Sequence, residues 1–317
     1  MFKFIKKSLL TVGIVMAAST AMAEYPEKPI TVVVGYSAGG GTDVMARTTM
    51  PFIEKYLGKG ARIVVKNMPG ASGQIGITKV ANSEPDGYTL GTFNLPGMMA
   101  RTLDRSVEYD RNSFSFLANV VNDPNVIVTQ KGSGIKSMDD LIKAAKSTPR
   151  AITVGMSSLG GDDHFLLIKL QKATETEFTV VPFRGSAPAR TAVMGGHVAV
   201  GIFNVSEVAK FQGELNVLGI AQAKRSSFAP DVPTFKEQGY DLINGSMRGV
   251  VAPKGLPADV QAKLEKAFRA ASQDKEFLSS MAATANPVEV VTGEEFKKLT
   301  DELYSLAKET WETTPWN

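Results

Sequence analysis

Two segments of this chain share one pattern, in which a short apolar run leads into a glycine-rich turn and then directly into a helix. The first has the β-branched run 30–34, a turn over 35–41 and an expected helix over 42–57. The second, about 120 residues later, has a turn over 155–161 and an expected helix over 162–173. A continuous β-branched run is typical of a strand buried on both faces. Because strands and helices alternate around both turns, we expect an α/β fold with βαβ units and parallel sheets.

The length of the chain agrees with this repetition, because 317 residues favour two domains over one. Hydrophobic residues make up 43% and charged residues 21%, a balance that argues against disorder and coiled coil. No low-complexity linker separates the two patterns. We therefore expect two α/β domains joined by ordinary extended segments.

Residues 1–23 are predicted to be a secretory signal peptide that is cleaved after Ala23. Three lysines form a basic start, an apolar run follows over 9–18, and the segment ends in the small-residue pattern Ala21-Met22-Ala23. The apolar run is too short to span about 30 Å of hydrocarbon. The mature protein is expected outside the cytoplasm, without a lipid anchor because no cysteine is present to carry one.

Composition excludes several kinds of chemistry. The absence of cysteine removes disulfides, thiolate metal sites and cysteine nucleophiles. The two histidines, His164 and His197, are too few for a multi-histidine site, so neither a metal nor a cofactor is expected. Loss of the three signal-peptide lysines leaves equal numbers of basic and acidic residues in place of a formal charge of +3. The mature chain therefore has no net positive charge that would favour a nucleic-acid partner.

The first glycine-rich turn is compatible with three kinds of site. Gly35-Tyr36-Ser37-Ala38-Gly39 matches the G-x-S-x-G pattern of a hydrolase nucleophile, although too few strands precede it for that fold. The turn also resembles a phosphate loop, except that Gly41 stands where such a loop needs lysine. The third possibility is capture of a small anion by backbone N–H groups at the helix start, and the alternative is a turn without a ligand. Because the pattern occurs twice, two helix starts facing one cleft would hold a molecule with two anionic ends.

Four side chains near the expected strand ends are candidates for the same site. His164 could contact a ligand or pack beneath its loop, and Arg184 could clamp a carboxylate or lie on the surface. Asn94 and Asn204 each follow an expected strand, where open α/β sheets bind ligands. Asparagines are also common in ordinary turns, which is the alternative for both.

A series of short motifs runs in order along almost the whole chain after residue 23. They are Tyr25-Pro26-Glu27-Lys28-Pro29-Ile30, Ala38-Gly39-Gly40 with Asp43 and Ala46-Arg47, and the segments 65–71, 85–90, 155–164, 183–188, 223–226, 230–234 and 252–257. Singly these motifs are weak, but together they are specific. The chain resembles the Bug-type solute-binding proteins of tripartite tricarboxylate transporters.

This resemblance implies a two-lobed periplasmic-binding-protein fold, similar to type II, with a hinge and a ligand cleft between two α/β domains. We expect the first lobe to comprise residues 24–124 and 247–317 and the second to comprise 125–246, with crossings near 122–125 and 245–248. The resemblance further implies a periplasmic receptor without enzymatic activity. It would work as a monomer that captures a small carboxylate (a di- or tricarboxylate or an aromatic acid) and delivers it to a membrane permease.

The site residues expected on these grounds come from both glycine-rich loops and from nearby strand ends. By resemblance to the family, Ser37 to Gly40 are expected in the first carboxylate-binding loop. Ser157, Ser158, Gly160 and His164 are expected in the opposing loop. The complete expected set is Tyr36, Ser37, Ala38, Gly39, Gly40, Asp43, Asn94, Ser157, Ser158, Gly160, His164, Arg184, Gly185, Asn204 and Arg248.

Two positions depart from the family pattern. The family often has an acid before asparagine where this chain has Phe203-Asn204, and the missing acid argues against a ligand with an ammonium group. The family often has an aromatic pair where this chain has Met247-Arg248. Arg248 would then either contact a carboxylate or be a solvated hinge residue. Two rival functions are a secreted serine hydrolase that uses Ser37 and a periplasmic sensor that presents its ligand to a signalling partner.

Overall fold

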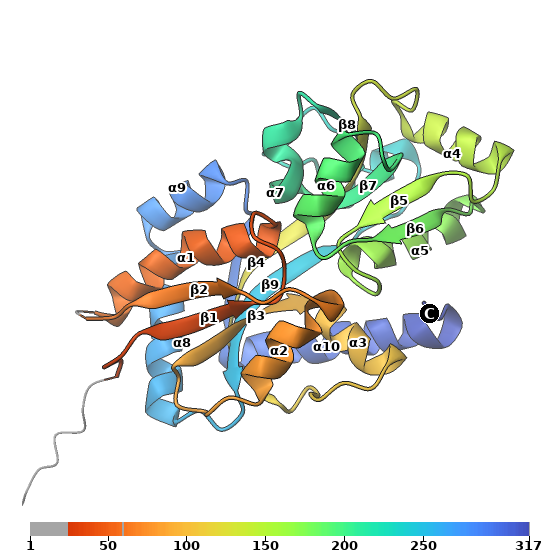
Figure 1. Ribbon diagram of the computed structural model, residues 1–317. Coiled ribbons are helices and arrows are strands. Elements are labelled where there is room, and N and C mark those ends of the chain that lie inside the picture. The colour runs from red at the N-terminus through yellow and green to blue at the C-terminus, as the bar shows by residue number, and fades with distance from the viewer. Residues whose placement is uncertain (1–24, 59, 317) are drawn as a thin grey trace, which may run out of the picture.

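The computed structural model describes residues 25–58 and 60–316, so the predicted signal peptide lies outside the described residues. The chain forms two α/β lobes that share strands of one mixed sheet (Figure 1). The strand order is β2-β1-β3-β9-β4-β7-β5-β6, and β8 and β10 both pair with β4. The strands are β1 (Ile30–Val34), β2 (Ile63–Asn67), β3 (Thr89–Leu95), β4 (Phe114–Gln130), β5 (Thr153–Met156), β6 (Thr179–Pro182), β7 (Val200–Asn204), β8 (Leu215–Ile220), β9 (Gly245–Pro253) and β10 (Val288–Thr292).

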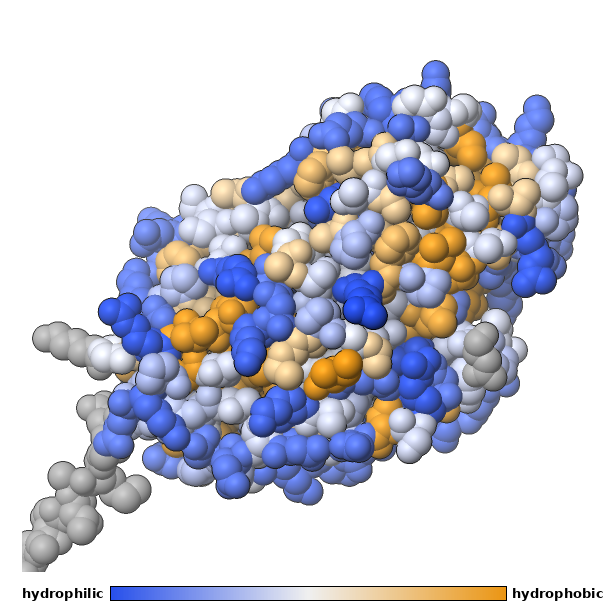
Figure 2. All heavy atoms as spheres, in the orientation of Figure 1, coloured by the Kyte–Doolittle hydropathy of each residue, from blue (hydrophilic) through white to orange (hydrophobic). Residues whose placement is uncertain are grey.

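Helices cover both faces of this sheet, as the alternation of strands and helices predicts. The α-helices are α1 (Gly41–Leu57), α2 (Gln74–Ala81), α3 (Gly97–Asp104), α4 (Met138–Ser147), α5 (Asp162–Thr174), α6 (Ser186–Met194), α7 (Val205–Val208), α8 (Ala258–Ser272), α9 (Lys275–Ala283) and α10 (Gly293–Thr313). Polar residues cover most of the face seen in Figure 2, with apolar residues in patches between them. Among the described residues, no helix combines the length and the apolar character that a membrane span requires.

The first lobe is built around β1, which lies parallel to β2 and β3. Its side chains pack into two cores. Ile30 and Val32 pack in the core that contains Met45 of α1, whereas Val33 packs in the core that contains Phe93 and residues of α2, α3 and α10. Both faces of β1 are therefore buried, which confirms the interpretation of its β-branched run.

The second lobe repeats this plan around β5, which lies parallel to β6 and β7. Leu166 and Leu170 of α5 pack with Val154 and Met156 in one of its cores. A second core contains Ala189 and residues of α7. The helices α1 and α5 thus start at equivalent places, each directly after a strand and a glycine-rich turn.

Two strands connect the lobes, and both are longer than the extended segments that the sequence predicts. Strand β4 pairs with β9 from Phe114 to Pro124 and then with β7 and β8 from Asn125 onward. Strand β9 starts at Gly245, opposite Pro124, and returns the chain to the first lobe, where it pairs with β3. The two continuous strands therefore form a double-stranded connection between the lobes.

The C-terminal segment of the first lobe also contacts the second lobe. Helix α10 runs past α3 toward α5, with the C-terminus marked in Figure 1. The rings of Trp316 and Phe165 of α5 lie 4.9 Å apart between centroids in an edge-on arrangement. Trp316 Nε1 donates to Asp104 Oδ2 at 3.0 Å. This apolar contact, which includes Ala100 and Ala307, adds to the strand connection between the lobes.

Candidate ligand-binding site

The loop between β1 and α1 is held in shape by Asp43 in the first turn of the helix. Asp43 Oδ2 accepts a hydrogen bond from the Gly39 backbone N–H at 2.9 Å, and Gly39 has a φ of +76°. Asp43 Oδ1 accepts from Asn67 Nδ2 and Arg47 Nε, both at 2.9 Å. The Asp43 carboxylate therefore ties the loop to α1 and β2 and positions the start of α1.

The loop between β5 and α5 is held by the same device with different residues. The Gly160 backbone N–H donates to His164 Nδ1 at 2.9 Å, four residues apart as in the first loop. Ser157 donates to Asp163 Oδ2 from both its backbone N–H at 2.5 Å and its hydroxyl at 2.6 Å. Burial, with a smaller contribution from Arg101, lowers the pKa of His164 to about 4, which keeps Nδ1 free to accept. His164 thus packs beneath its loop, the alternative that the sequence left open.

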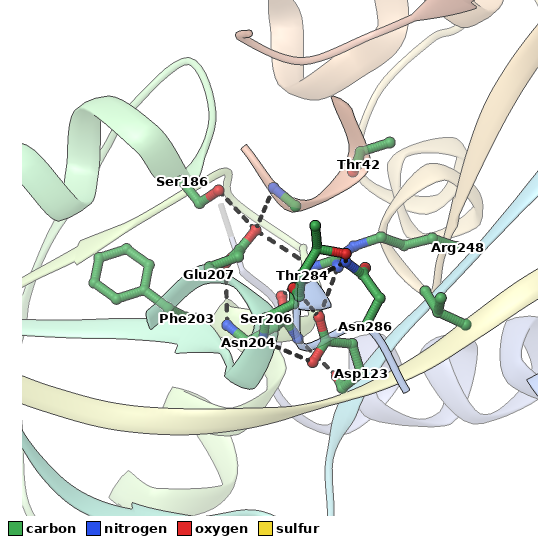
Figure 3. Close-up of polar contacts among 12 residues, drawn as sticks. Thr42, Asp123, Ser186, Phe203, Asn204, Ser206, Glu207, Arg248, Thr284 and Asn286 are labelled. Atoms are coloured by element: carbon green, nitrogen blue, oxygen red, sulfur yellow. Dashed lines mark hydrogen bonds and ion pairs between the residues drawn. The ribbon is translucent and has the colours of Figure 1, made fainter. Parts of the chain in front are cut away.

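Arg248 of β9 is the central cation of the space between these loops, and only 1% of its surface is exposed. Arg248 Nη1 lies 2.7 Å from Asp123 Oδ2 of β4. Arg248 Nη2 donates to Asn204 Oδ1 at 2.6 Å (Figure 3). The expectation of a solvated hinge residue is therefore wrong, because the side chain turns inward to neutralise buried carboxylates. Burial raises the pKa of Asp123 to about 6, and the nearby Arg248 limits that rise.

Glu207 of α7 extends this network into the first lobe. Glu207 Oε1 accepts from the Gly41 backbone N–H at 3.1 Å and from Ser186 Oγ at 2.7 Å, and it lies 3.3 Å from Arg248 Nη2 (Figure 3). Glu207 Oε2 accepts from the Asn204 backbone N–H at 3.0 Å, which completes the capping box of α7. A carboxylate of the second lobe thus occupies the N-terminus of α1, the position where the sequence predicts an anionic ligand.

Glycine at position 41 is required by this close approach. A Cβ atom there would lie 2.6 Å from Arg248 Nη1 and 2.7 Å from Glu207 Oε1. Both distances are shorter than a side-chain carbon tolerates. The departure from the phosphate-loop pattern therefore has a structural reason, since the side chains of Arg248 and Glu207 fill the space that a lysine side chain would need.

Asp162 adds a second acid to the wall of the second lobe. Its Oδ2 accepts from Asn125 Nδ2 at 2.7 Å and from Asn204 Nδ2 at 3.0 Å. Burial raises the pKa of Asp162, and burial together with the Asp162 charge raises the pKa of Asp163 to about 8. Phe203, where the family often has an acid, is buried in the core of the second lobe. The cavity wall of the second lobe therefore does carry an acid, but it is Asp162 of α5 and not a residue at the end of β7.

These side chains enclose a polar cavity of about 20 Å³ between the lobes, which is close to the room that one water molecule needs. Three buried polar atoms of its lining, Asn94 Oδ1, Ser246 Oγ and Arg248 Nε, have no hydrogen-bond partner. Buried polar groups are nearly always paired, so unpaired ones in a cavity indicate a place where a polar ligand binds. In the part of the chain that the structure describes, no group of three or more histidine and acidic side chains could hold a metal ion.

The cavity brings together about half of the residues expected from the sequence. Those that line it are Tyr36, Gly40, Asn94, Ser157, Ser158, Asn204 and Arg248. Those that lie outside its lining are Ser37, Ala38, Gly39, Asp43, Gly160, His164, Arg184 and Gly185. Most of this second group shapes the loops, as Asp43 and His164 do, whereas Arg184 is exposed to solvent.

Sequence analysis missed other lining residues, namely Gly41, Thr42, Gly97, Gly161, Asp162, Ser186, Glu207 and Ser246. Two of these missed residues, Glu207 and Asp162, carry a signal in the sequence. Asn204 and Glu207 have the spacing of a capping box, which predicts a helix start at the end of a strand. Asp162 is an acid at the first position of a helix that follows a glycine-rich turn. The rest are small residues whose role depends on the packing of the lobes.

Ser37 lacks the partners that a hydrolase nucleophile needs. Its hydroxyl is buried without a hydrogen-bond partner. The Gly185 backbone packs closely against it, because a Cβ at Gly185 would lie 2.5 Å from Ser37 Oγ. His164 Nδ1 is engaged with Gly160, so it does not serve as the base for Ser37. A nucleophilic serine requires a general base within hydrogen-bond reach. The hydrolase interpretation is therefore wrong.

The two lobes and the polar cavity between them define a class of binding protein that encloses its ligand between two α/β domains. Residues 45–308 match the family described as the tripartite tricarboxylate transporter family receptor. The chain belongs to this family of solute-binding receptors, which are periplasmic and not enzymes.

Individual relatives agree with this assignment. The chain is 33% identical to Protein BugT of Bordetella pertussis over 287 residues, which cover 88% of this chain and 87% of BugT. It is 26% identical to MatC of Rhodopseudomonas palustris, solved with bound malate, with a TM-score of 0.82 over 90% of this chain and 99% of MatC. An R. palustris protein solved with adipate is also 26% identical, with a TM-score of 0.86 over 91% of this chain and 98% of that one.

Proposed function

We propose that this receptor captures a small organic carboxylate in the polar cavity and delivers it to the membrane permease of a tripartite tricarboxylate transporter. The observation that carries this proposal is the cavity itself, which both lobes line and which contains unpaired buried donors and acceptors. Malate and adipate in two related structures support the ligand class. We further propose that the exported protein is a monomer that begins at Glu24.

Binding by this route requires the lobes to separate, because a cavity of about 20 Å³ is too small for a carboxylic acid. The proposed lobes are residues 24–124 with 247–317 and residues 125–246. The change of strand partners on β4 after Pro124 supports this division. Bending at the shared strands would open the cleft, and ligand contacts with both lobes would shift the population back to the closed form.

Exchange of carboxylates would be the central step. Glu207 accepts the Gly41 N–H and contacts Arg248 in this structure. An incoming ligand carboxylate would replace Glu207 at the start of α1 and take over the backbone donors there. Arg248 would remain beside it as a guanidinium donor, with Nε free. Glu207 therefore acts as a built-in substitute for the ligand.

A thermal-shift screen tests the proposed function. The full mature chain is heated with mono-, di- and tricarboxylates and with aromatic acids. Acidic amino acids are included because the Asp162 carboxylate, which lines the cavity, is a counter-charge for an ammonium group. A ligand at 100 times its dissociation constant adds about 2.7 kcal/mol to the free energy of unfolding, which raises the melting temperature by several degrees. If none of these acids raises the melting temperature, the proposed ligand class is wrong.

A further inference from the structure

A second cavity, of about 420 Å³, lies beside the hinge and shares no lining residue with the first. Strand β9 separates the two cavities, since Ser246 and Arg248 line the first whereas Gly245 and Met247 line the second. Alternate residues of a strand point to opposite faces, so the two cavities lie on opposite sides of the hinge strands. The volume is in the range of small-molecule sites.

The walls of this second cavity are mainly apolar and come from both lobes. Leu303, Leu306 and Ala307 of α10 lie on one side, and Phe165 of α5 lies on the other. Ile243, just before β9, completes this surface. Leu306 and Ile243 are each 52% exposed, so both present apolar surface at this cavity that a ligand could cover.

One ammonium group stands among these apolar residues. Lys169 Nζ donates to the Ile243 carbonyl at 3.0 Å and to Asn244 Oδ1 at 2.9 Å, and burial lowers its pKa. Within residues 25–58 and 60–316, no carboxylate pairs with Lys169 at ion-pair distance. The acid that lines the cavity, Glu289, is exposed and accepts from Asn122 Nδ2 at 3.0 Å. An ammonium group has three donors, so Lys169 keeps one for a further acceptor.

We propose that the cavity is a second binding site, which takes an amphipathic monocarboxylate such as a medium-chain alkanoate. The carboxylate binds Lys169 Nζ, and the alkyl chain covers Leu306, Ile243 and Phe165. This site does not depend on the identity of the transported ligand. It lies outside the polar cavity, where the glycine-rich loops provide backbone donors.

Calorimetric titration of the full mature chain with decanoate, below its micelle-forming concentration, tests the proposal. Octanoate should bind more weakly, by about fourfold for each methylene removed, because each buried methylene contributes about 0.8 kcal/mol. Leu306→Glu should weaken decanoate binding by about tenfold or more, because it places a charge in the apolar wall. The matched control is Leu278→Glu on α9, a leucine outside the cavity that is 40% exposed, which should leave decanoate binding unchanged.

The role of Lys169 is tested by charge selectivity. Lys169→Met should abolish the preference for decanoate over decanol, whereas Lys172→Met, on the exposed side of the same helix, should preserve it. The proposal is overturned if decanoate does not bind, if Leu306→Glu binds it as well as the natural chain does, or if Lys172→Met loses the preference for decanoate over decanol as much as Lys169→Met does.

Discussion

The Glu207 carboxylate of the second lobe accepts a hydrogen bond from the Gly41 backbone N–H of the first lobe at 3.1 Å. Gly41 begins α1, where unpaired backbone N–H groups carry partial positive charge. The same carboxylate also accepts from Ser186 and lies beside Arg248. One side chain therefore connects both lobes at the place where a receptor of this family is expected to hold its ligand.

Removing the charge of Glu207 should strengthen carboxylate binding. Glu207→Gln keeps the size of the side chain and its capping oxygen but no longer competes as an anion for Gly41 and Arg248. We expect the best acid from the screen to bind more tightly, by about tenfold or more, since a charge-assisted hydrogen bond contributes about 1.5–3 kcal/mol. Calorimetric titration measures this, with Glu295→Gln at an exposed site as the control. Weaker binding by Glu207→Gln would show that Glu207 assists the ligand instead of competing with it.

The two serines predicted for the first and second loops should behave differently. Ser158 lines the polar cavity, whereas Ser37 lies outside its lining. Ser158→Ala should weaken binding by about 0.5–1.5 kcal/mol for a neutral hydrogen bond, or by about 1.5–3 kcal/mol if the hydroxyl donates to a carboxylate. Ser37→Ala should leave the affinity unchanged, because its side chain does not line the polar cavity. Equal affinities for all three proteins, measured by calorimetry, would place the ligand away from Ser158.

Gly160 should tolerate no side chain. Its φ is +62°, and a Cβ there would lie 1.6 Å from Arg101 Nη2, a fully buried guanidinium. Gly160→Ala should lower the free energy of unfolding by at least the roughly 1–3 kcal/mol that a strained backbone costs. Gly132→Ala, which meets no atom within 4 Å, should change it little. Denaturant titration of both variants provides the comparison, and an unaffected Gly160→Ala would contradict the packing between α3 and the second loop.

The buried His164 should make stability depend on pH. Its pKa in the folded protein is lowered to about 4, so the unfolded chain binds a proton at a higher pH than the folded chain does. Its contribution to stability is therefore present above about pH 6.5 and is lost as the pH falls toward 4. Other groups, such as Asp163, titrate in the opposite sense, so the difference from His164→Asn is the useful quantity.

We expect the unfolding free energy of the natural chain, relative to that of His164→Asn, to fall by roughly 2–3 kcal/mol between pH 7.5 and 4. Urea titrations of both proteins at a series of pH values measure this difference. Asparagine can still accept from the Gly160 N–H, so the loop has a partner in both proteins. A difference that stays constant with pH would contradict the neutral, accepting His164.

The sequence predicts the elements next to the two glycine-rich turns well, because local signals define them. The predicted strand 30–34 matches β1, and the predicted helix 162–173 ends one residue before the end of α5. β-branched runs and acids in a first helical turn act within a few residues, so one sequence is enough to recognise them. The order of family motifs then indicates the two-lobed fold.

The elements and contacts that depend on distant residues could not be predicted in the same way. Strand β4 contains Asn122, Asp123, Pro124 and Asn125, a composition typical of a turn, yet it continues because β9 on one side and β7 on the other supply its partners. The inward position of Arg248 depends on Asp123 and Glu207, which are far away in the sequence. No local pattern specifies such pairings.

A crystal structure of the protein with the best acid from the screen tests the central claim most directly. The account predicts a ligand carboxylate within hydrogen-bond distance of the Gly41 backbone N–H, beside Arg248, with the Glu207 side chain moved away from Gly41. A structure in which the acid binds while Glu207 remains on the Gly41 N–H would contradict the exchange of carboxylates at the start of α1.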